Sequence, residues 1–169
     1  MTTNHLADLK TIIDHLDSCG RLTRVTSEVD LKHDLAGIAA HFESKPRAEL
    51  LEKVKGYDVP VFTGLYWSRE LLAQLMAQEE AALPGFVSGC IQNWQKNPVA
   101  PVMVEHGPIV DGGAHPLDLS ALPIPIHAMK DGGPYFDAAV VIARDPETGV
   151  RNASIQRFMV VNKDTLHIN

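Results

Sequence analysis

The chain is poor in features that mark several protein classes. It has 2 cysteines in 169 residues, Cys19 and Cys90, which are too few and too isolated for a disulfide framework. A small buried thiol is a commoner explanation for each than a nucleophile. No apolar run approaches the roughly 18 residues of a membrane span, and the first residues lack the charged-then-apolar layout of a signal peptide. We therefore expect a cytoplasmic protein without a membrane partner.

Positive charge is also scarce. The sequence has 15 Lys and Arg against 21 Asp and Glu, a formal net charge of -6. Binding of nucleic acid needs a basic stripe, and the sequence contains none. It has neither a Walker pattern nor a dinucleotide glycine fingerprint, and its 8 histidines lack the close pairing of a zinc site. These absences argue against nucleic acid, nucleoside triphosphate, NAD and structural zinc.

The remaining composition is that of an ordinary globular protein, with 45% hydrophobic and 21% charged residues. The length allows one domain, or one domain with an appended lobe. Helical spacing of apolar residues predicts helices over residues 6–16, 34–44, 69–79 and 84–95. Ser68 is the predicted N-cap of the third of these helices. Extended patterns predict strands over residues 21–29, 49–61 and 102–104. The first half of the chain therefore mixes helices and strands.

The texture changes after residue 97. Prolines and glycines gather between residues 98 and 134, which predicts extended segments and turns, with a hairpin or loop over 106–115. We therefore predict an α/β N-terminal lobe over residues 1–97 and a β-rich portion over 98–169.

The most informative stretch lies near the C-terminus. Residues 136–143 and 151–161 are two apolar runs joined by Asp-Pro-Glu-Thr-Gly at 145–149, which predicts an antiparallel hairpin. The second run carries polar side chains where a purely structural strand would have apolar or solvated ones. These polar residues are Asn152, Ser154, Gln156 and Arg157.

Three segments together resemble one family. They are Leu-Pro-Ile-Pro-Ile-His at 122–127, Asp-Gly-Gly-Pro-Tyr-Phe at 131–136 and Asn-Ala-Ser-Ile-Gln-Arg at 152–157. In this order they resemble the UbiD-like decarboxylases, which use prenylated FMN. The resemblance implies an α+β fold, with a helix-bearing N-terminal lobe followed by an antiparallel, β-rich flavin-binding portion that is split-barrel-like. It also implies that the chain is an N-terminal portion, truncated at the C-terminus.

The resemblance implies roles for the polar strand. Arg157 would be catalytic and would hold the substrate carboxylate, whereas Asn152 would be a ligand of Mn²⁺ or Mg²⁺, with K⁺ as a further candidate ion. The cofactor-binding residues would be Asn152, Ala153, Ser154, Ile155, Gln156 and Arg157. From the residues alone, Arg157 could equally pair with an acidic residue at a sheet edge, Asn152 could be a turn residue, and Ile155 could be core.

Spacing limits how these residues can act together. Residues 152 and 157 are roughly 17 Å apart along an ideal strand, and their side chains have opposite parity. They cannot both touch one small group unless the strand is bulged or bent, but they can serve opposite ends of a long ligand. His127, beside the Leu-Pro-Ile-Pro segment, is a substrate-side candidate or a solvated loop histidine.

The function implied is reversible decarboxylation of a small aromatic or α,β-unsaturated carboxylic acid. A flavin prenyltransferase would supply the cofactor, and the full-length form would be a homo-oligomer. In the family, the metal-binding His and Glu and the catalytic Glu residues lie beyond the position of Asn169, so the 169 residues alone are predicted to be inactive. The alternative is a non-catalytic, truncated domain that serves as a binding or assembly module. The particular acid and the direction of reaction stay open.

Overall fold

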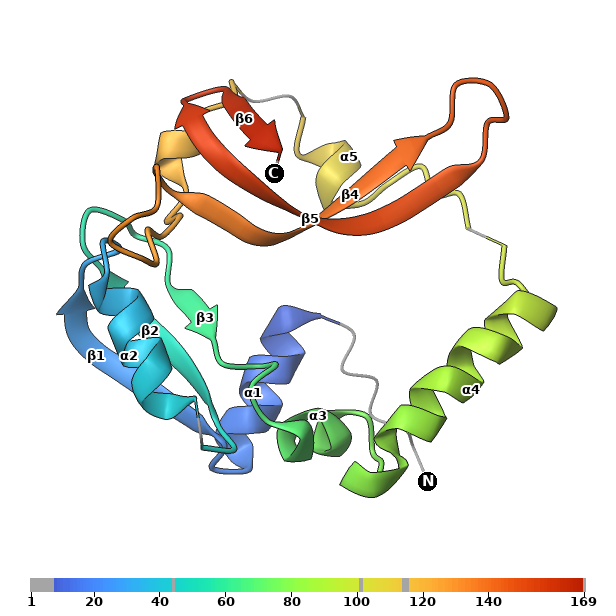
Figure 1. Cartoon of the computed structure of the whole chain (residues 1–169), viewed down its shortest axis with the longest axis horizontal. Coiled ribbons are helices and arrows are strands. Elements are labelled where there is room, and N and C mark those ends of the chain that lie inside the picture. The colour runs from blue at the N-terminus through green and yellow to red at the C-terminus, as the bar shows by residue number, and fades with distance from the viewer. Residues whose placement is uncertain (1–7, 44, 101, 114–115, 169) are drawn as a thin grey trace. The chain divides into compact units, whose positions relative to one another are not determined.

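The computed structural model describes residues 8–43, 45–100, 102–113 and 116–168 (Figure 1). It combines helices with two three-stranded sheets, β1-β2-β3 and β4-β5-β6, and confirms the predicted α+β class. The chain forms two compact units, which comprise the described residues of 1–22, 44–48 and 64–116, and of 23–43, 49–63 and 117–169. The units interleave along the sequence and so divide the chain differently from the boundary predicted after residue 97. Within the described ranges, none of the helices has the length and apolar character needed to cross a bilayer.

The first unit is helical. Its elements are α1 (Leu9–Ser18), α3 (Arg69–Leu75), the 3₁₀ turn η1 (Glu80–Ala82), α4 (Leu83–Lys96) and α5 (Pro108–Asp111). Asp8 caps α1, because its carboxylate accepts from the Thr11 backbone N–H at 2.8 Å. The predicted cap at Ser68 is confirmed by a 3.2 Å hydrogen bond from the Leu71 N–H to its hydroxyl. α3 ends at Leu75, short of the predicted residue 79, because the backbone turns into the left-handed region at Ala77 (φ +52°).

The second unit contains the main core. Strands β1 (Leu22–Val29), β2 (Ala48–Val54) and β3 (Val61–Thr63) form a sheet in the order β1-β2-β3, and helix α2 (Asp34–Phe42) lies beside it (Figure 1). Val29 of β1, Leu35 of α2 and Leu51 of β2 pack together with Leu31 and Val54 in one buried cluster. The spacing of apolar residues in the sequence therefore predicted the helix and strands that form this core.

The second sheet of this unit contains the predicted hairpin. Strands β4 (Tyr135–Arg144) and β5 (Arg151–Asn162) pair antiparallel, and β6 (Thr165–Ile168) pairs with the other edge of β5. In the connection, Asp145 accepts hydrogen bonds from the backbone N–H groups of Glu147 (2.7 Å) and Thr148 (3.1 Å), and Gly149 has φ +72°. The hairpin prediction is confirmed, whereas β6 was not predicted.

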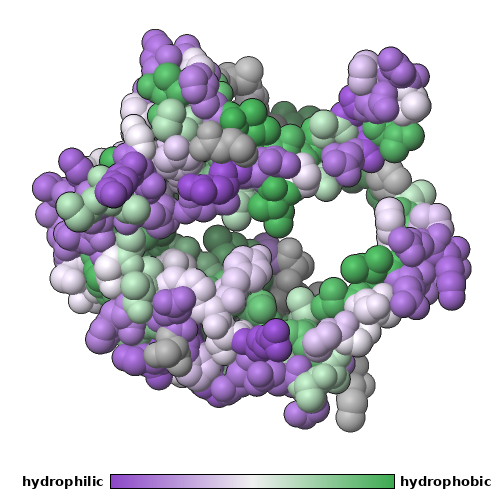
Figure 2. Space-filling model, in the orientation of Figure 1, coloured by the Kyte–Doolittle hydropathy of each residue, from purple (hydrophilic) through white to green (hydrophobic). Residues whose placement is uncertain are grey.

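Register divides the β4–β5 side chains between two faces. We call one the Ile155 face, which comprises Val140, Ile142, Ala153 and Ile155. The other is the Ser154 face, which comprises Ala139, Val141, Ser154 and Gln156. The Ser154 face is half-buried, whereas Val140, Ile142 and Ile155 are 68%, 73% and 69% exposed. Figure 2 shows hydrophobic (green) surface along this ribbon and hydrophilic (purple) surface at its tip.

Two predictions in the proline-rich segment are wrong. Residues 102–104 form no strand. Their backbone pairs with no neighbouring strand among the described residues, and their valine and methionine side chains are exposed. Within 106–115, where a hairpin or loop was predicted, Pro108–Asp111 forms the short helix α5. Asp111 closes this turn by accepting from the Gly107 N–H at 2.9 Å. His115 lies outside the described residues.

Burial predicts unequal effects of shortening apolar side chains in the second unit. Leu51→Ala should lower the free energy of unfolding by about 2–5 kcal/mol, because Leu51 is fully buried and its removal leaves a cavity. Ile142→Ala should change it by less than about 0.5 kcal/mol, because Ile142 is mostly exposed. Urea unfolding followed by circular dichroism measures both. Equal losses would mean that the Ile155 face is covered in solution.

The hairpin connection should depend on pH. The backbone N–H of Thr148, followed by that of Glu147 and the Thr148 hydroxyl, lowers the pKa of Asp145. A lowered folded pKa means that these bonds stabilise the turn above the unfolded pKa of about 3.9 and that this contribution is lost as pH falls through the folded value. In an NMR titration, the Glu147 and Thr148 amide protons should shift together below the ordinary Asp range. Asp145→Asn should abolish the shift, and an inflection at or above the ordinary value would contradict the assignment.

Candidate functional site

The predicted site residues all lie on β5 but face two ways. The register of β5 against β4 has no extra residue on β5 between Arg151 and Met159. Arg157 therefore projects on the Ile155 face, whereas Asn152 projects on the Ser154 face. The opposite parity read from the sequence holds in the folded strand. Whether the residues of 152–157 bind a cofactor or a metal stays a prediction.

A β-bulge in β4 lies directly opposite Arg157. Phe136 pairs with Phe158 and Ala139 with Gln156, so Asp137 and Ala138 together oppose Arg157. A bulge of this kind switches the parity of the strand that carries it. As a result Asp137, before the bulge, and Val140 and Ile142, after it, face the same side of the sheet.

Three side chains gather around Asp137 on that side. Its Oδ2 lies 3.0 Å from His127 Nδ1, and its Oδ1 lies 3.9 Å from Arg157 Nε. The Arg157 guanidinium also lies over the Tyr135 ring, 5.1 Å from its centroid, in the geometry of a cation–π contact. The side chains of His127, Asp137 and Arg157 are 38%, 44% and 57% exposed. We call His127, Tyr135, Asp137 and Arg157 the Asp137 cluster.

Backbone hydrogen bonds hold the segment that carries His127. The Ile126 N–H donates to the Leu31 carbonyl at 3.1 Å, and the His33 N–H donates to the Ile126 carbonyl at 3.1 Å. His33 adopts φ +78°, a left-handed conformation that is unusual for a side chain of this size, where the chain turns into α2. The Tyr135 N–H donates to the Pro125 carbonyl at 3.1 Å, which ties the same segment to β4. The segment is thus attached to the connection between β1 and α2 and to the start of β4.

An open cavity of about 400 Å³ adjoins the Asp137 cluster. Its walls are mainly apolar and come from Leu35 of α2, from β3 and from residues 122–125. His127 and residues 135–137 line its remaining side. The arrangement joins an apolar space to an edge that carries one imidazole and one carboxylate, and Arg157 contacts that carboxylate from outside the lining.

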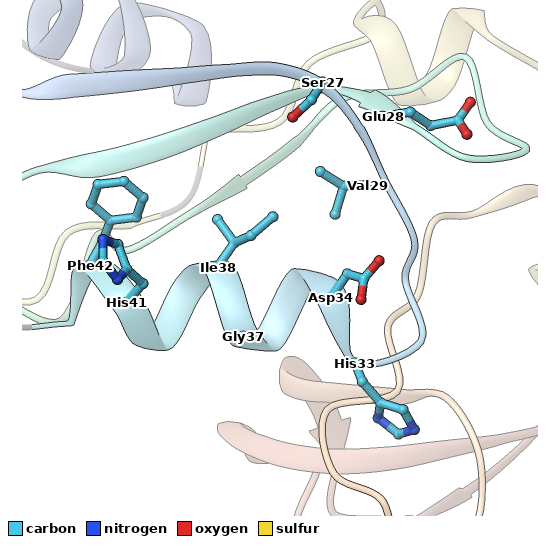
Figure 3. A pocket seen from close by; sticks show the side chains of 9 residues that line it. All are labelled: Ser27, Glu28, Val29, His33, Asp34, Gly37, Ile38, His41 and Phe42. Atoms are coloured by element: carbon cyan, nitrogen blue, oxygen red, sulfur yellow. The ribbon is translucent and has the colours of Figure 1, made fainter.

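A second hollow, of about 470 Å³, lies between β1 and α2 and contains none of the predicted site residues (Figure 3). Val29 and Ile38 point toward one another across it, whereas Glu28 and His33 point away (Figure 3). Although histidines and acidic residues line it, the described residues hold no group of three or more His, Cys, Asp or Glu side chains that could bind a metal ion. We therefore place the candidate site at the Asp137 cluster.

Sequence reasoning missed the two residues that frame Arg157. Tyr135 and Asp137 were visible as members of the Asp-Gly-Gly-Pro-Tyr-Phe segment and the residue after it. Their contact with Arg157 depends on the strand register and on the bulge, which one sequence does not reveal. His127 was singled out, and the structure brings it to the same carboxylate as Arg157.

Two family models match the chain. Residues 13–87 match the N-terminal domain of 3-octaprenyl-4-hydroxybenzoate carboxy-lyase, and residues 102–169 match the Rift-related domain of the same enzyme. Together the two matches span most of the sequence.

Individual proteins and structures agree with these matches. An uncharacterised protein of Rhodospirillum rubrum is 63% identical over 97% of this chain and 35% of its own length. The anhydromevalonate phosphate decarboxylase of Methanothermobacter thermautotrophicus is 36% identical over 85% of this chain and 32% of its own. An evolved dimeric form of the UbiD-class enzyme HmfF of Pelotomaculum thermopropionicum, solved with prenylated FMN, superposes with a TM-score of 0.82 at 37% identity, over 95% of this chain and 37% of that one. The chain therefore spans about a third of the length of the relatives it matches.

Proposed function

The chain belongs to the UbiD-like family of carboxy-lyases, and from this premise we propose that it supplies the carboxylate-binding arginine and one flavin-contacting strand of a decarboxylase. The substrate would be a small aromatic or α,β-unsaturated carboxylic acid, and the cofactor prenylated FMN with a divalent metal ion. The chain spans about a third of the length of these relatives, so the activity is proposed for a protein that contains this segment.

The position of Arg157 is the observation that carries this proposal. Its guanidinium lies on an exposed face beside an apolar cavity, held over Tyr135 and next to Asp137. A guanidinium keeps its charge at any working pH and offers a rigid fork of donors that matches a carboxylate. An aromatic acid could place its ring in the apolar space and its carboxylate on Arg157.

The Ile155 face fits a flavin. Val140, Ile142 and Ile155 present an exposed, apolar surface on the same face as Arg157, against which an apolar ring system can pack. Ala153, Ile155 and Arg157 would contact the cofactor from this face, whereas Asn152, Ser154 and Gln156 would reach only a portion that passes to the other side of β5. When bound, prenylated FMN supplies the electron sink that loss of carbon dioxide requires, which no ordinary side chain provides.

The described residues do not complete a metal site. Asn152 offers one amide oxygen, a donor that suits Mn²⁺ or Mg²⁺, and no group of three His, Cys, Asp or Glu side chains stands near enough together in these ranges to bind an ion. The other ligands of a divalent ion, and those of any K⁺, must come from elsewhere. We therefore assign no step to the metal.

The remaining features of the proposal concern the protein's surroundings. Loading would need a flavin prenyltransferase, the compartment would be the cytoplasm, and the full-length form would be a homo-oligomer. The alternative, a non-catalytic binding or assembly module, predicts that the chain neither retains flavin nor supports decarboxylation.

Cofactor retention tests the flavin-contacting face. The chain, co-expressed with a flavin prenyltransferase, should purify with a weak flavin absorbance band. Ile155→Asp should remove the band, because a carboxylate on this exposed position would sit against the ring. Val161→Asp is the matched control, since it adds the same charge at another exposed apolar position of β5 and should keep the band. A colourless wild-type protein would favour the binding-module alternative.

Decarboxylation tests Arg157. The chain can be grafted in place of the matching segment of the phenolic acid decarboxylase of Streptomyces, which is 30% identical to it, and carbon dioxide release from a phenolic acid measured. Arg157→Ala should lower kcat/KM by about 100-fold or more, because it removes charge-assisted hydrogen bonds worth about 3 kcal/mol together. Arg151→Ala, on the same strand and face, should leave kcat/KM within about threefold. Equal losses in both variants would contradict the assignment.

A further inference from the structure

The Asp137 carboxylate engages a different partner with each oxygen. Oδ2 lies 3.0 Å from His127 Nδ1, within hydrogen-bond distance, and Oδ1 lies 3.9 Å from Arg157 Nε, an ion-pair distance. All three side chains are well exposed to solvent, so pairs of this kind add little to folding stability. The two contacts of Asp137 are therefore better explained by orientation of its partner side chains than by stabilisation of the fold.

The bulge explains why an acidic residue meets Arg157 here. Asp137 is the first of the two β4 residues that oppose Arg157, and it faces the same side of the sheet. Tyr135, two residues earlier, faces the same side and lies under the guanidinium. One short stretch of β4 thus supplies both a ring below the guanidinium plane and a carboxylate at its Nε edge.

These two contacts leave one edge of Arg157 for a ligand. The guanidinium carbon lies over the Tyr135 ring, 5.1 Å from its centroid, and the Asp137 carboxylate lies nearest Nε, at 3.9 Å. The two Nη atoms carry the further pair of parallel donors that can bind a carboxylate through both oxygens. His127 holds the second oxygen of Asp137 and so restrains the carboxylate itself.

We propose that Asp137 is a positioning residue that orients Arg157 for the substrate carboxylate, with His127 as the restraint on Asp137. This inference rests on the proposed function, in which Arg157 binds that carboxylate. It predicts that loss of the Asp137 charge weakens binding of an anion, whereas simple electrostatics predicts that the same loss tightens it. Neutralising Asp137 removes a negative charge near an anion site, which by itself would tighten anion binding about threefold at a separation of about 6 Å in water. Loss of orientation would instead weaken binding about 2–10-fold, the usual effect of leaving one long side chain to be ordered on binding.

Benzoate binding to the 169-residue chain, followed by NMR, separates the two effects. Two signals are read in one titration: the dissociation constant and the Nε–Hε resonance of Arg157, which reports the order of the guanidinium. In the wild type the resonance should stand apart from those of exposed arginines and shift on benzoate addition. Asp137→Asn should move the free resonance to the position of exposed arginines and raise the dissociation constant about 2–10-fold. His127→Asn should change both signals in the same direction and by less.

Asp111→Asn is the matched control. Asp111 also pairs with a histidine, His106, at 3.2 Å, and its neutralisation removes the same charge from the other unit. It should leave both signals unchanged. The amide spectrum of β4 and β5 in each variant shows that the sheet remains folded.

The outcomes are distinct. If Asp137→Asn binds benzoate as tightly as the wild type or more tightly, with the Arg157 resonance in place, the positioning role is overturned and the proposed function stands. If wild-type Arg157 does not respond to benzoate at all, the carboxylate contact fails, and the proposed function and this inference fail with it.

Discussion

The alternation of side chains along β5 is the constraint on which the site depends. A strand shows every second residue to one side, so Asn152 and Arg157 cannot face the same way while β5 stays regular. The irregularity lies instead in β4, where the extra residue opposite Arg157 changes which side chains share its face. Because of that single bulge, Arg157 stands beside a carboxylate and an aromatic ring at one end and beside an apolar surface at the other.

Local signals account for the parts of the fold that the sequence predicted. The cap at Ser68 and the turn over 145–149 depend on hydrogen bonds between residues two or three positions apart, so residue type alone reveals them. The spacing that marks α2 and β2 follows from one buried cluster. Strand β6 and helix α5 were missed because each is short, four residues, and depends on what it pairs or packs with. The strand wrongly predicted over 102–104 has the composition of a strand but no neighbour among the described residues with which to pair.

The candidate site shows the same division between local and distant information. The family resemblance indicated Arg157 and the residues before it, because the motif is contiguous along the chain. The contacts of Arg157 come from residues about 20 positions away, and they required the register of β4 against β5 to be known. His127 reaches the cluster through a third segment, which hydrogen bonds attach to the connection between β1 and α2 and to β4. When three segments form a site in this way, a single sequence predicts only the residues of the segment that carries the motif.

The chemistry of the described residues indicates what the rest of an active assembly must add. Arg157 can bind an acid and the Ile155 face can support a flat cofactor, and both are recognition tasks that fixed side chains perform without changing protonation. Decarboxylation also requires an electron sink, and replacement of the lost carboxyl group requires a proton donor placed at the reacting carbon. In the cluster, the titratable partners Asp137 and His127 face one another, and the Asp137 carboxylate also lies nearest Nε of Arg157. In the proposed function, this chain would bind and orient the substrate, and the proton donor would come from another segment.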